Sequence, residues 1–171
     1  MYSIKPITNF EDFESVFKVF EGFPYSEIWT PSQIKKEFDS YKKNGYVFGY
    51  YIEDKCVGMI SAVPVDSCSV TFDVPDGLSV IYVRDIAVLP EFRHRGIGST
   101  LFKNMLEFAK KLGYSYAFFR YSDTNPMILG IAKKLGFTRD YDACEVISHP
   151  RHDDSLLRSD EDLRFFMYKK L

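Results

Sequence analysis

The chain has 171 residues, 46% hydrophobic and 27% charged, which suits one globular domain over residues 1–171 with a core that needs no disulfide or metal. Its formal net charge of −2 argues against a general binder of nucleic acid or of membrane surfaces, because such proteins carry a basic excess. No apolar run reaches membrane-spanning length, and the opening MYSIKPITNF lacks a secretory signal, so we expect a cytoplasmic protein.

The first part of the chain predicts a strand, two helices and a hairpin. Asn9 and Thr30 are typical helix N-caps, and Pro31 suits a first helical position. Gly22 and Gly45 follow the two helices, and Asp54-Lys55 predicts the hairpin turn. The expected elements are a strand at 2–7, helices at 10–21 and 31–44, and strands at 46–53 and 56–65.

The second part predicts alternating strands and helices. A nearly continuous apolar run at 80–89 is typical of a central strand, and a loop at 66–79 precedes it. The elements expected after it are a helix at 98–112, a strand at 115–122, a helix at 126–135, a strand at 137–148, a polar loop at 149–162 and a last strand at 163–171. This order predicts a mixed α/β sheet whose first half is antiparallel.

The stretch EFRHRGIGSTL, residues 91–101, joins the central strand to the next helix. A helix N-terminus presents unpaired N–H groups and a partial positive charge, and glycines allow a ligand to approach the backbone closely. Arg93 and Arg95 add positive charge at the same place. The pattern therefore predicts a site for a phosphate or diphosphate, the alternative being a plain strand-to-helix turn with solvated arginines.

Two common phosphate loops do not match this stretch, since G-x-x-x-x-G-K-[ST] is absent and the dinucleotide fingerprint lacks its third glycine. Residues 93–98, RHRGIG, instead resemble the R/Q-x-x-G-x-G/A signature of the GNAT (GCN5-related) N-acetyltransferase superfamily. DTNPMILGIAKKLGF resembles its N-x(10)-G-F segment, with Asn125, Gly136 and Phe137 in register. The resemblance is specific over residues 80–138 and extends in element order over nearly the whole chain.

The resemblance implies the GNAT fold: a mixed central sheet of about seven strands with four main helices, splayed between the fourth and fifth strands. It also implies acetyl-CoA as cosubstrate. The pantetheine arm would pair with the backbone of Ile86, Ala87 and Val88. Asn125 would touch the pantetheine or the adenosine end, or else only cap its helix. The residues expected to hold the diphosphate are Arg93, His94, Arg95, Gly96, Ile97, Gly98 and Ser99.

The resemblance further implies direct attack of an amine on a thioester, with the N–H of Val88 stabilising the oxyanion. Asp85 is the expected proton acceptor, or else a partner in an ion pair; because strand residues alternate, only one of Arg84 and Asp85 should face the site. Many members carry a tyrosine that protonates the leaving thiolate, and this chain has Ala132 at that position. We expect either that Tyr121 acts as the acid or that the thiolate leaves unaided. The alternative for Tyr121 is a packed aromatic side chain of the sheet.

Tyr25, Glu27 and Trp29 form an expected aromatic and acidic wall for the acceptor. The resemblance implies that the acceptor is a primary amine, either of a small molecule, such as a polyamine, aminoglycoside or amino acid, or of a protein terminus. No metal is expected, because His149 and His152 lack a third ligand at a recognised spacing and the three cysteines fit no zinc pattern. A homodimer through the last strand is one expectation. The rival functions are a non-catalytic acyl-CoA sensor and an unrelated phosphate-binding α/β enzyme.

Overall fold

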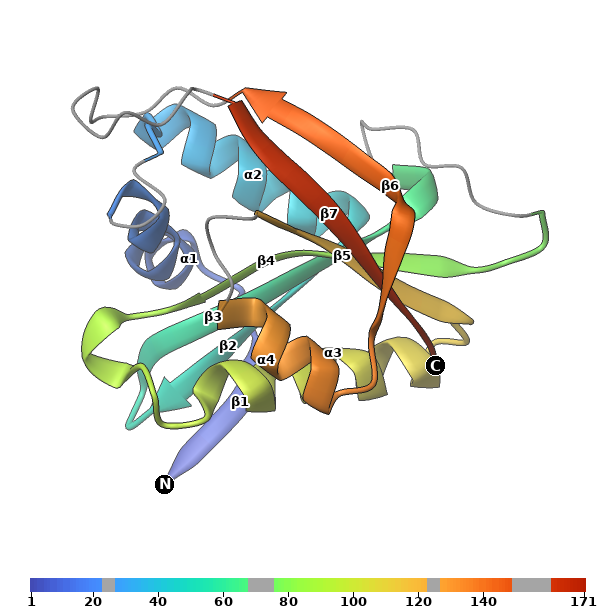
Figure 1. The fold of residues 1–171 in the computed structure, drawn as a ribbon. Coiled ribbons are helices and arrows are strands. Elements are labelled where there is room, and N and C mark those ends of the chain that lie inside the picture. The colour runs from blue at the N-terminus through green and yellow to red at the C-terminus, as the bar shows by residue number, and fades with distance from the viewer. Residues whose placement is uncertain (23–26, 68–75, 123–126, 149–160) are drawn as a thin grey trace.

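The computed structural model describes residues 1–22, 27–67, 76–122, 127–148 and 161–171, and their side chains apart from those of 141–148 and 161–163. Its seven-stranded sheet has the order β1-β2-β3-β4-β5-β7-β6 (Figure 1). The strands are β1 (Tyr2–Pro6), β2 (Tyr46–Ile52), β3 (Lys55–Pro64), β4 (Val80–Val88), β5 (Tyr116–Ser122), β6 (Thr138–Ser148) and β7 (Glu161–Lys170). The α-helices are α1 (Phe10–Phe17), α2 (Pro31–Asn44), α3 (Ile97–Lys111) and α4 (Met127–Lys134).

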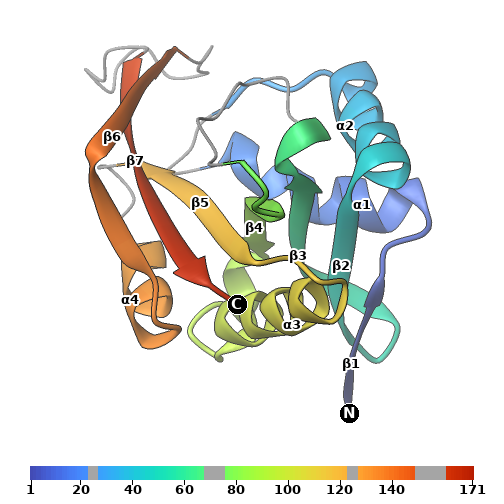
Figure 2. The same cartoon turned by 90° about the vertical axis from the view of Figure 1, so that its right-hand side faces the viewer.

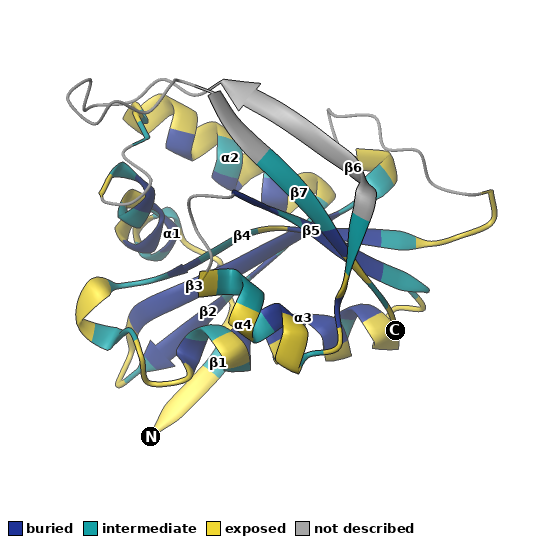
Figure 3. Ribbon diagram, viewed as in Figure 1, coloured by how far each residue is buried: buried dark blue, intermediate teal, exposed yellow. Residues whose placement is uncertain are grey.

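The helices cover both faces of the sheet, α1 and α2 on one and α3 and α4 on the other (Figures 1 and 2). Each face has its own apolar cluster, and consecutive strand residues divide between them: Ile81 packs toward α3, whereas Tyr82 packs toward α1 and α2. The central strands are therefore buried on both sides, as Figure 3 shows for β3. Within the described residues, no helix combines the length and the apolar character needed to cross a membrane.

The local signals at the first two helices are confirmed. The side chain of Asn9 accepts a hydrogen bond from the N–H of Asp12 at 2.8 Å. Thr30 caps α2 with a reciprocal capping box to Gln33, and Pro31 is its first residue. The hairpin turn is one residue earlier than predicted: Glu53 and Asp54 are its central residues, both with positive φ (48° and 70°), the conformation that a tight two-residue hairpin turn requires.

The parallel pair β4 and β5 opens along its length. Val80, Ile81 and Tyr82 pair with Tyr116, Ala117 and Phe118, and no later pair joins the two strands within the described residues. The C-terminal half of β4 therefore separates from β5, which confirms the predicted splay. The chain then places β7 between β5 and β6, antiparallel to both, so the last strand of the sequence is an interior strand of the sheet.

A close contact sets the distance between β3 and the start of α3. A β-carbon at Gly58 would lie 3.1 Å from Cγ2 of Ile97 and 3.2 Å from the carbonyl oxygen of Ala87. We expect Gly58→Ala to lower the free energy of unfolding by about 1–3 kcal/mol, because a packed core and a strand backbone cannot yield cheaply.

The matched control is Gly130→Ala in α4, where a β-carbon would have no neighbour within 4 Å. There the same substitution should stabilise the protein by about 0.5–1 kcal/mol, since alanine loses less backbone entropy than glycine in a helix. Denaturant unfolding of both variants measures the two changes. A stable Gly58→Ala protein would contradict the close packing of α3 on β3.

Candidate active site

A β-bulge in β4 shapes the site. Ser61 of β3 is opposite Asp85, whereas the next residue, Ala62, is opposite Val83, so Arg84 is an extra residue on β4. The bulge interrupts the alternation of side chains, and both Arg84 and Asp85 line the same pocket. The prediction that only one of this pair would face the site is therefore wrong, because it assumed an unbroken strand.

Asp85 is held by two hydroxyl groups. Tyr41 of α2 donates a short hydrogen bond to Oδ2, and Ser61 Oγ lies 3.2 Å from the same oxygen. The Ser61 hydroxyl also accepts the N–H of Asp85 at 3.2 Å. Burial, followed by the charge of Asp85, raises the pKa of Tyr41 well above its ordinary value, so this phenol stays protonated as a donor. These hydroxyls orient the Asp85 carboxylate.

Glu37 of α2 is a site residue that the sequence analysis missed. Its Oε2 lies 3.1 Å from the Arg84 guanidinium. Burial raises the pKa of Glu37, Arg84 lowers it, and the charge of Asp85 raises it further, with a net upward shift. A helix brings residues i and i+4 to one face, so Glu37 shares a face with Tyr41; this spacing was the available signal.

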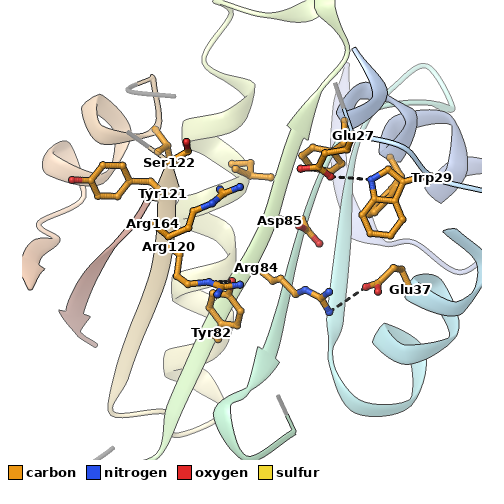
Figure 4. Close-up of a pocket in the computed structure, with 14 residues that line it drawn as sticks. Glu27, Trp29, Glu37, Tyr82, Arg84, Asp85, Arg120, Tyr121, Ser122 and Arg164 are labelled. Atoms are coloured by element: carbon orange, nitrogen blue, oxygen red, sulfur yellow. Dashed lines mark hydrogen bonds and ion pairs between the residues drawn. The ribbon is translucent and has the colours of Figure 1, made fainter. Parts of the chain in front are cut away.

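The pocket, of about 240 Å³, lies on the α1 and α2 side of the opening between β4 and β5 (Figure 4). Glu27 and Trp29 are at its edge, where the Trp29 indole N–H donates to Glu27 Oε2 at 2.9 Å. Tyr25 falls outside the described residues. The remaining lining residues are Phe17, Phe20, Glu37, Tyr82, Arg84, Asp85, Ile86, Arg120, Tyr121, Ser122, Ile128 and Arg164.

Tyr121 lines the pocket from β5, but its hydroxyl points away from Asp85 in Figure 4. Its ring packs beside those of Phe119 and Phe165, at centroid distances of 6.4 and 5.5 Å. Ala132, where many GNAT enzymes carry a tyrosine, is fully buried in α4. The Tyr121 ring therefore packs within a row of aromatic side chains. An acid role for Tyr121 stays a prediction.

The turn before α3 leaves the first amide groups of the helix without backbone carbonyl partners among the described residues. His94 and Gly96 both have left-handed backbones, with φ of 61° and 79°. Gly96 is the N-cap of α3, and Thr100 is the first helical residue whose N–H reaches a carbonyl, that of Gly96 at 3.0 Å. A β-carbon at Gly96 would meet no atom within 4 Å, so this surface is open. The amides of residues 97–99 therefore fit an anion at the positive end of the helix.

The two arginines of the turn brace it. Arg93 Nε donates to the carbonyl of Val88 at 3.1 Å, and Arg95 donates to the carbonyl of Glu91 at 3.0 Å. The Arg95 guanidinium also lies over the Phe92 ring, 5.3 Å from its centre. The two side chains thus fix the geometry of the loop and keep two positive charges beside the amides of residues 97–99. A diphosphate bound there would accept hydrogen bonds from the amides and be attracted by the two guanidinium groups.

The backbone of β4 offers hydrogen bonds to the opening beside β5. The N–H of Leu89 donates to Val57 of β3 at 2.9 Å, and residues of an antiparallel ladder alternate in the direction of their polar groups. The backbone groups of Ala87 are therefore directed at β3, and those of Ile86 and Val88 at the opening. Ile86 is placed to pair with an added strand-like ligand through its backbone groups, and Val88 through its N–H, because the Val88 carbonyl accepts from Arg93. Asn125, the other predicted contact, falls outside the described residues.

Comparisons with known proteins agree with this geometry. Residues 10–137 match the model of the acetyltransferase (GNAT) family. Solved structures that are similar include an N-acetyltransferase from Staphylococcus aureus Mu50 (TM-score 0.73, 17% identity, 99% of this chain and 98% of that one). A phosphinothricin acetyltransferase from Sinorhizobium meliloti in complex with AcCoA has a TM-score of 0.73 and 14% identity, over 99% of this chain and 88% of that one.

A third similar structure is the Bacillus subtilis acetyltransferase in complex with CoA, with a TM-score of 0.65 and 16% identity over 99% of this chain and 97% of that one. At these identities the structures show a common fold. A search of curated proteins found no significant match. The family model covers most of the chain and includes both sequence motifs and the splayed strands, so the chain belongs to the acetyltransferase (GNAT) family, whose cosubstrate is acetyl-CoA.

Proposed function

We propose that this protein is an N-acetyltransferase that passes the acetyl group of acetyl-CoA to a primary amine by direct attack. The observation that carries the proposal is the position of Asp85. Its carboxylate lies in the pocket beside the opening of β4 and β5, directly before Ile86 and Val88, whose backbone faces that opening. A proton acceptor thus adjoins the groups that would hold the thioester.

Asp85 would take the proton of the attacking amine, directly or through one water. Tyr41 and Ser61 fix the direction of its carboxylate, and the raised pKa of Tyr41 keeps that phenol a donor. Glu37 would take part in carrying the proton away, because its raised pKa brings it closer to the working pH of an acid–base group. The N–H of Val88 would stabilise negative charge on the acetyl oxygen.

The fit of acetyl-CoA rests on three features of this chain. The amides of residues 97–99 and the charges of Arg93 and Arg95 suit the diphosphate. The backbone of Ile86 and Val88 suits the amide groups of the pantetheine arm. Acetyl-CoA supplies an acetyl group activated as a thioester, and the protein supplies alignment, a proton acceptor and a donor for the oxygen.

The proposal is tested by measuring thiol release from acetyl-CoA over a panel of primary amines and peptides. We expect release above the hydrolytic background for at least one amine, together with a product heavier by one acetyl group. Micromolar CoA binding without release for any amine would favour the alternative, a non-catalytic acyl-CoA sensor, for which the alanine at position 132 is the motivating feature. Thermal stabilisation by ATP or NAD but not by CoA would contradict both.

A further inference from the structure

The cation next to Asp85 along the chain, Arg84, is paired with a different acid. The bulge in β4 places both side chains in one pocket. Among the described carboxylates, Arg84 forms an ion pair with Glu37 of α2, at 3.1 Å, and none with Asp85. Figure 4 shows the Arg84 side chain extending toward Glu37. Asp85 is bonded instead to two hydroxyl groups, those of Tyr41 and Ser61.

One face of α2 keeps these two pairs apart. Glu37 and Tyr41 are four residues apart in the helix, so they lie on the same face. Glu37 holds the Arg84 guanidinium, which also lies over the Tyr41 ring, 5.7 Å from its centre. The Tyr41 hydroxyl donates to Asp85. Two neighbouring residues of β4 are thus bound by two residues of α2, the cation by the acid and the acid by the phenol.

The partner of Arg84 matters for the chemistry of Asp85. The side chains of Arg84 and Glu37 are 36% and 21% exposed, so water screens their charges only in part. Opposite charges attract each other strongly where water is scarce, and a carboxylate beside a guanidinium takes up a proton less readily. An Arg84 side chain released from Glu37 would therefore approach Asp85 and make it a weaker proton acceptor.

Resting on the proposed N-acetyltransferase function, we infer that Glu37 is a positioning residue that holds the Arg84 guanidinium away from Asp85. The Asp85 carboxylate then stays available to take the proton of the attacking amine. This role is separate from the transfer of the proton by Glu37 itself, because it passes through Arg84 and requires no contact with the substrate. The two roles can be told apart, since only the positioning role depends on a cation at residue 84.

Further charged residues line the pocket, namely Glu27, Arg120 and Arg164, and each has interactions of its own. These residues are the same in every variant proposed below. A comparison of variants at residues 37 and 84 therefore isolates the effect of the ion pair on the reaction.

The test is a double-mutant cycle at residues 37 and 84, with kcat measured at saturating acetyl-CoA and the best amine of the panel. Glu37→Gln keeps the size of the side chain but releases Arg84, so kcat should fall by about tenfold. The double variant Glu37→Gln/Arg84→Gln also removes the released cation. Its kcat should rise to at least about fivefold above that of Glu37→Gln.

Arg84→Gln is the matched comparison, because it breaks the same ion pair but leaves no guanidinium to approach Asp85. Its kcat should stay at least about fivefold above that of Glu37→Gln. Both single variants should lower the melting temperature, because each leaves a partly buried charge without its partner. Asp39→Asn is the control on α2, since it breaks an ion pair with Lys35 outside the pocket lining and should retain the parent kcat.

The outcomes separate the positioning role from the proposed function. An unchanged kcat in Glu37→Gln would overturn the positioning role. A loss in Glu37→Gln that Arg84→Gln does not relieve would also overturn it, because a residue that transfers the proton itself gives that result. Both results leave the N-acetyltransferase function intact. Thiol release by the parent for none of the amines would overturn the proposed function, and the positioning role with it.

Discussion

Asp85→Asn is expected to lower kcat for amine acetylation by about 100-fold or more near neutral pH, the lower end of what a general base contributes. The amide keeps an oxygen that can accept from Tyr41 and Ser61, so the fold and the pocket should persist. What is lost is the group that takes the amine's proton. The decrease in kcat should be largest at a pH well below the pKa of the amine. It should become smaller at high pH, where the amine arrives neutral. A pH–rate profile of parent and variant measures this.

Asp12→Asn is the matched control for that experiment. Asp12 also accepts a hydrogen bond from a tyrosine hydroxyl, that of Tyr51 at 2.9 Å, but it lies in α1 and does not line the pocket. Its variant should retain the parent kcat and pH profile. If Asp85→Asn shows the same profile as the parent, Asp85 is not the base, and Glu37 is the next group to change.

Gly96→Asp is expected to weaken CoA binding by at least about 100-fold, equivalent to about 2.7 kcal/mol. Two effects oppose binding. The new side chain occupies space that is open beside Gly96, and its carboxylate repels the diphosphate at the start of the helix. At about 4 Å and an effective dielectric of about 20, one pair of like charges already costs about 4 kcal/mol. Isothermal titration with CoA measures the change.

Folding should survive this substitution. The left-handed backbone of Gly96 costs a non-glycine residue about 1–2 kcal/mol. A carboxylate at the positive end of α3 stabilises the helix by about 0.3–1 kcal/mol and so offsets part of this cost. The melting temperature should therefore fall only modestly while CoA affinity collapses.

Gly113→Asp provides the matched control at the other end of the same helix. Gly113 also has a left-handed backbone, with φ of 87°, and a β-carbon there would meet no atom within 4 Å. The new acid faces the negative end of α3, so this variant should lose more stability than Gly96→Asp and yet bind CoA like the parent. CoA affinity of Gly96→Asp within threefold of the parent would show that the diphosphate binds elsewhere.

Local signals predicted the elements because local chemistry decides them. Asn9 and Thr30 cap their helices through bonds that span three residues, and the phenylalanine spacing of α1 is itself a property of a helix. The turn before α3 was predicted on the same basis, since glycine at a left-handed N-cap is a requirement of the backbone alone. The hairpin turn was misplaced by one residue because neither Glu53 nor Asp54 is glycine, the usual sign of positive φ.

The site depended on contacts between distant residues. Tyr41 and Asp85 are 44 residues apart in the sequence, and nothing near either one indicates the other. Glu37 was missed because a single acid on an amphipathic helix normally faces water, and only the docking of α2 against β4 brings it to Arg84. Arg164 was missed for a similar reason, because it reaches the pocket only when β7 inserts beside β5.

The sequence by itself determined the order of the elements, the open helix start at residues 96–99 and the family, because each depends on residues close together along the chain. Only the tertiary structure decided which charges share the pocket. The bulge at Arg84, the insertion of β7 and the packing of α2 each result from pairing over long sequence separations. Such pairing is set by the total burial of the sheet and its helices, a quantity that no short stretch of sequence contains.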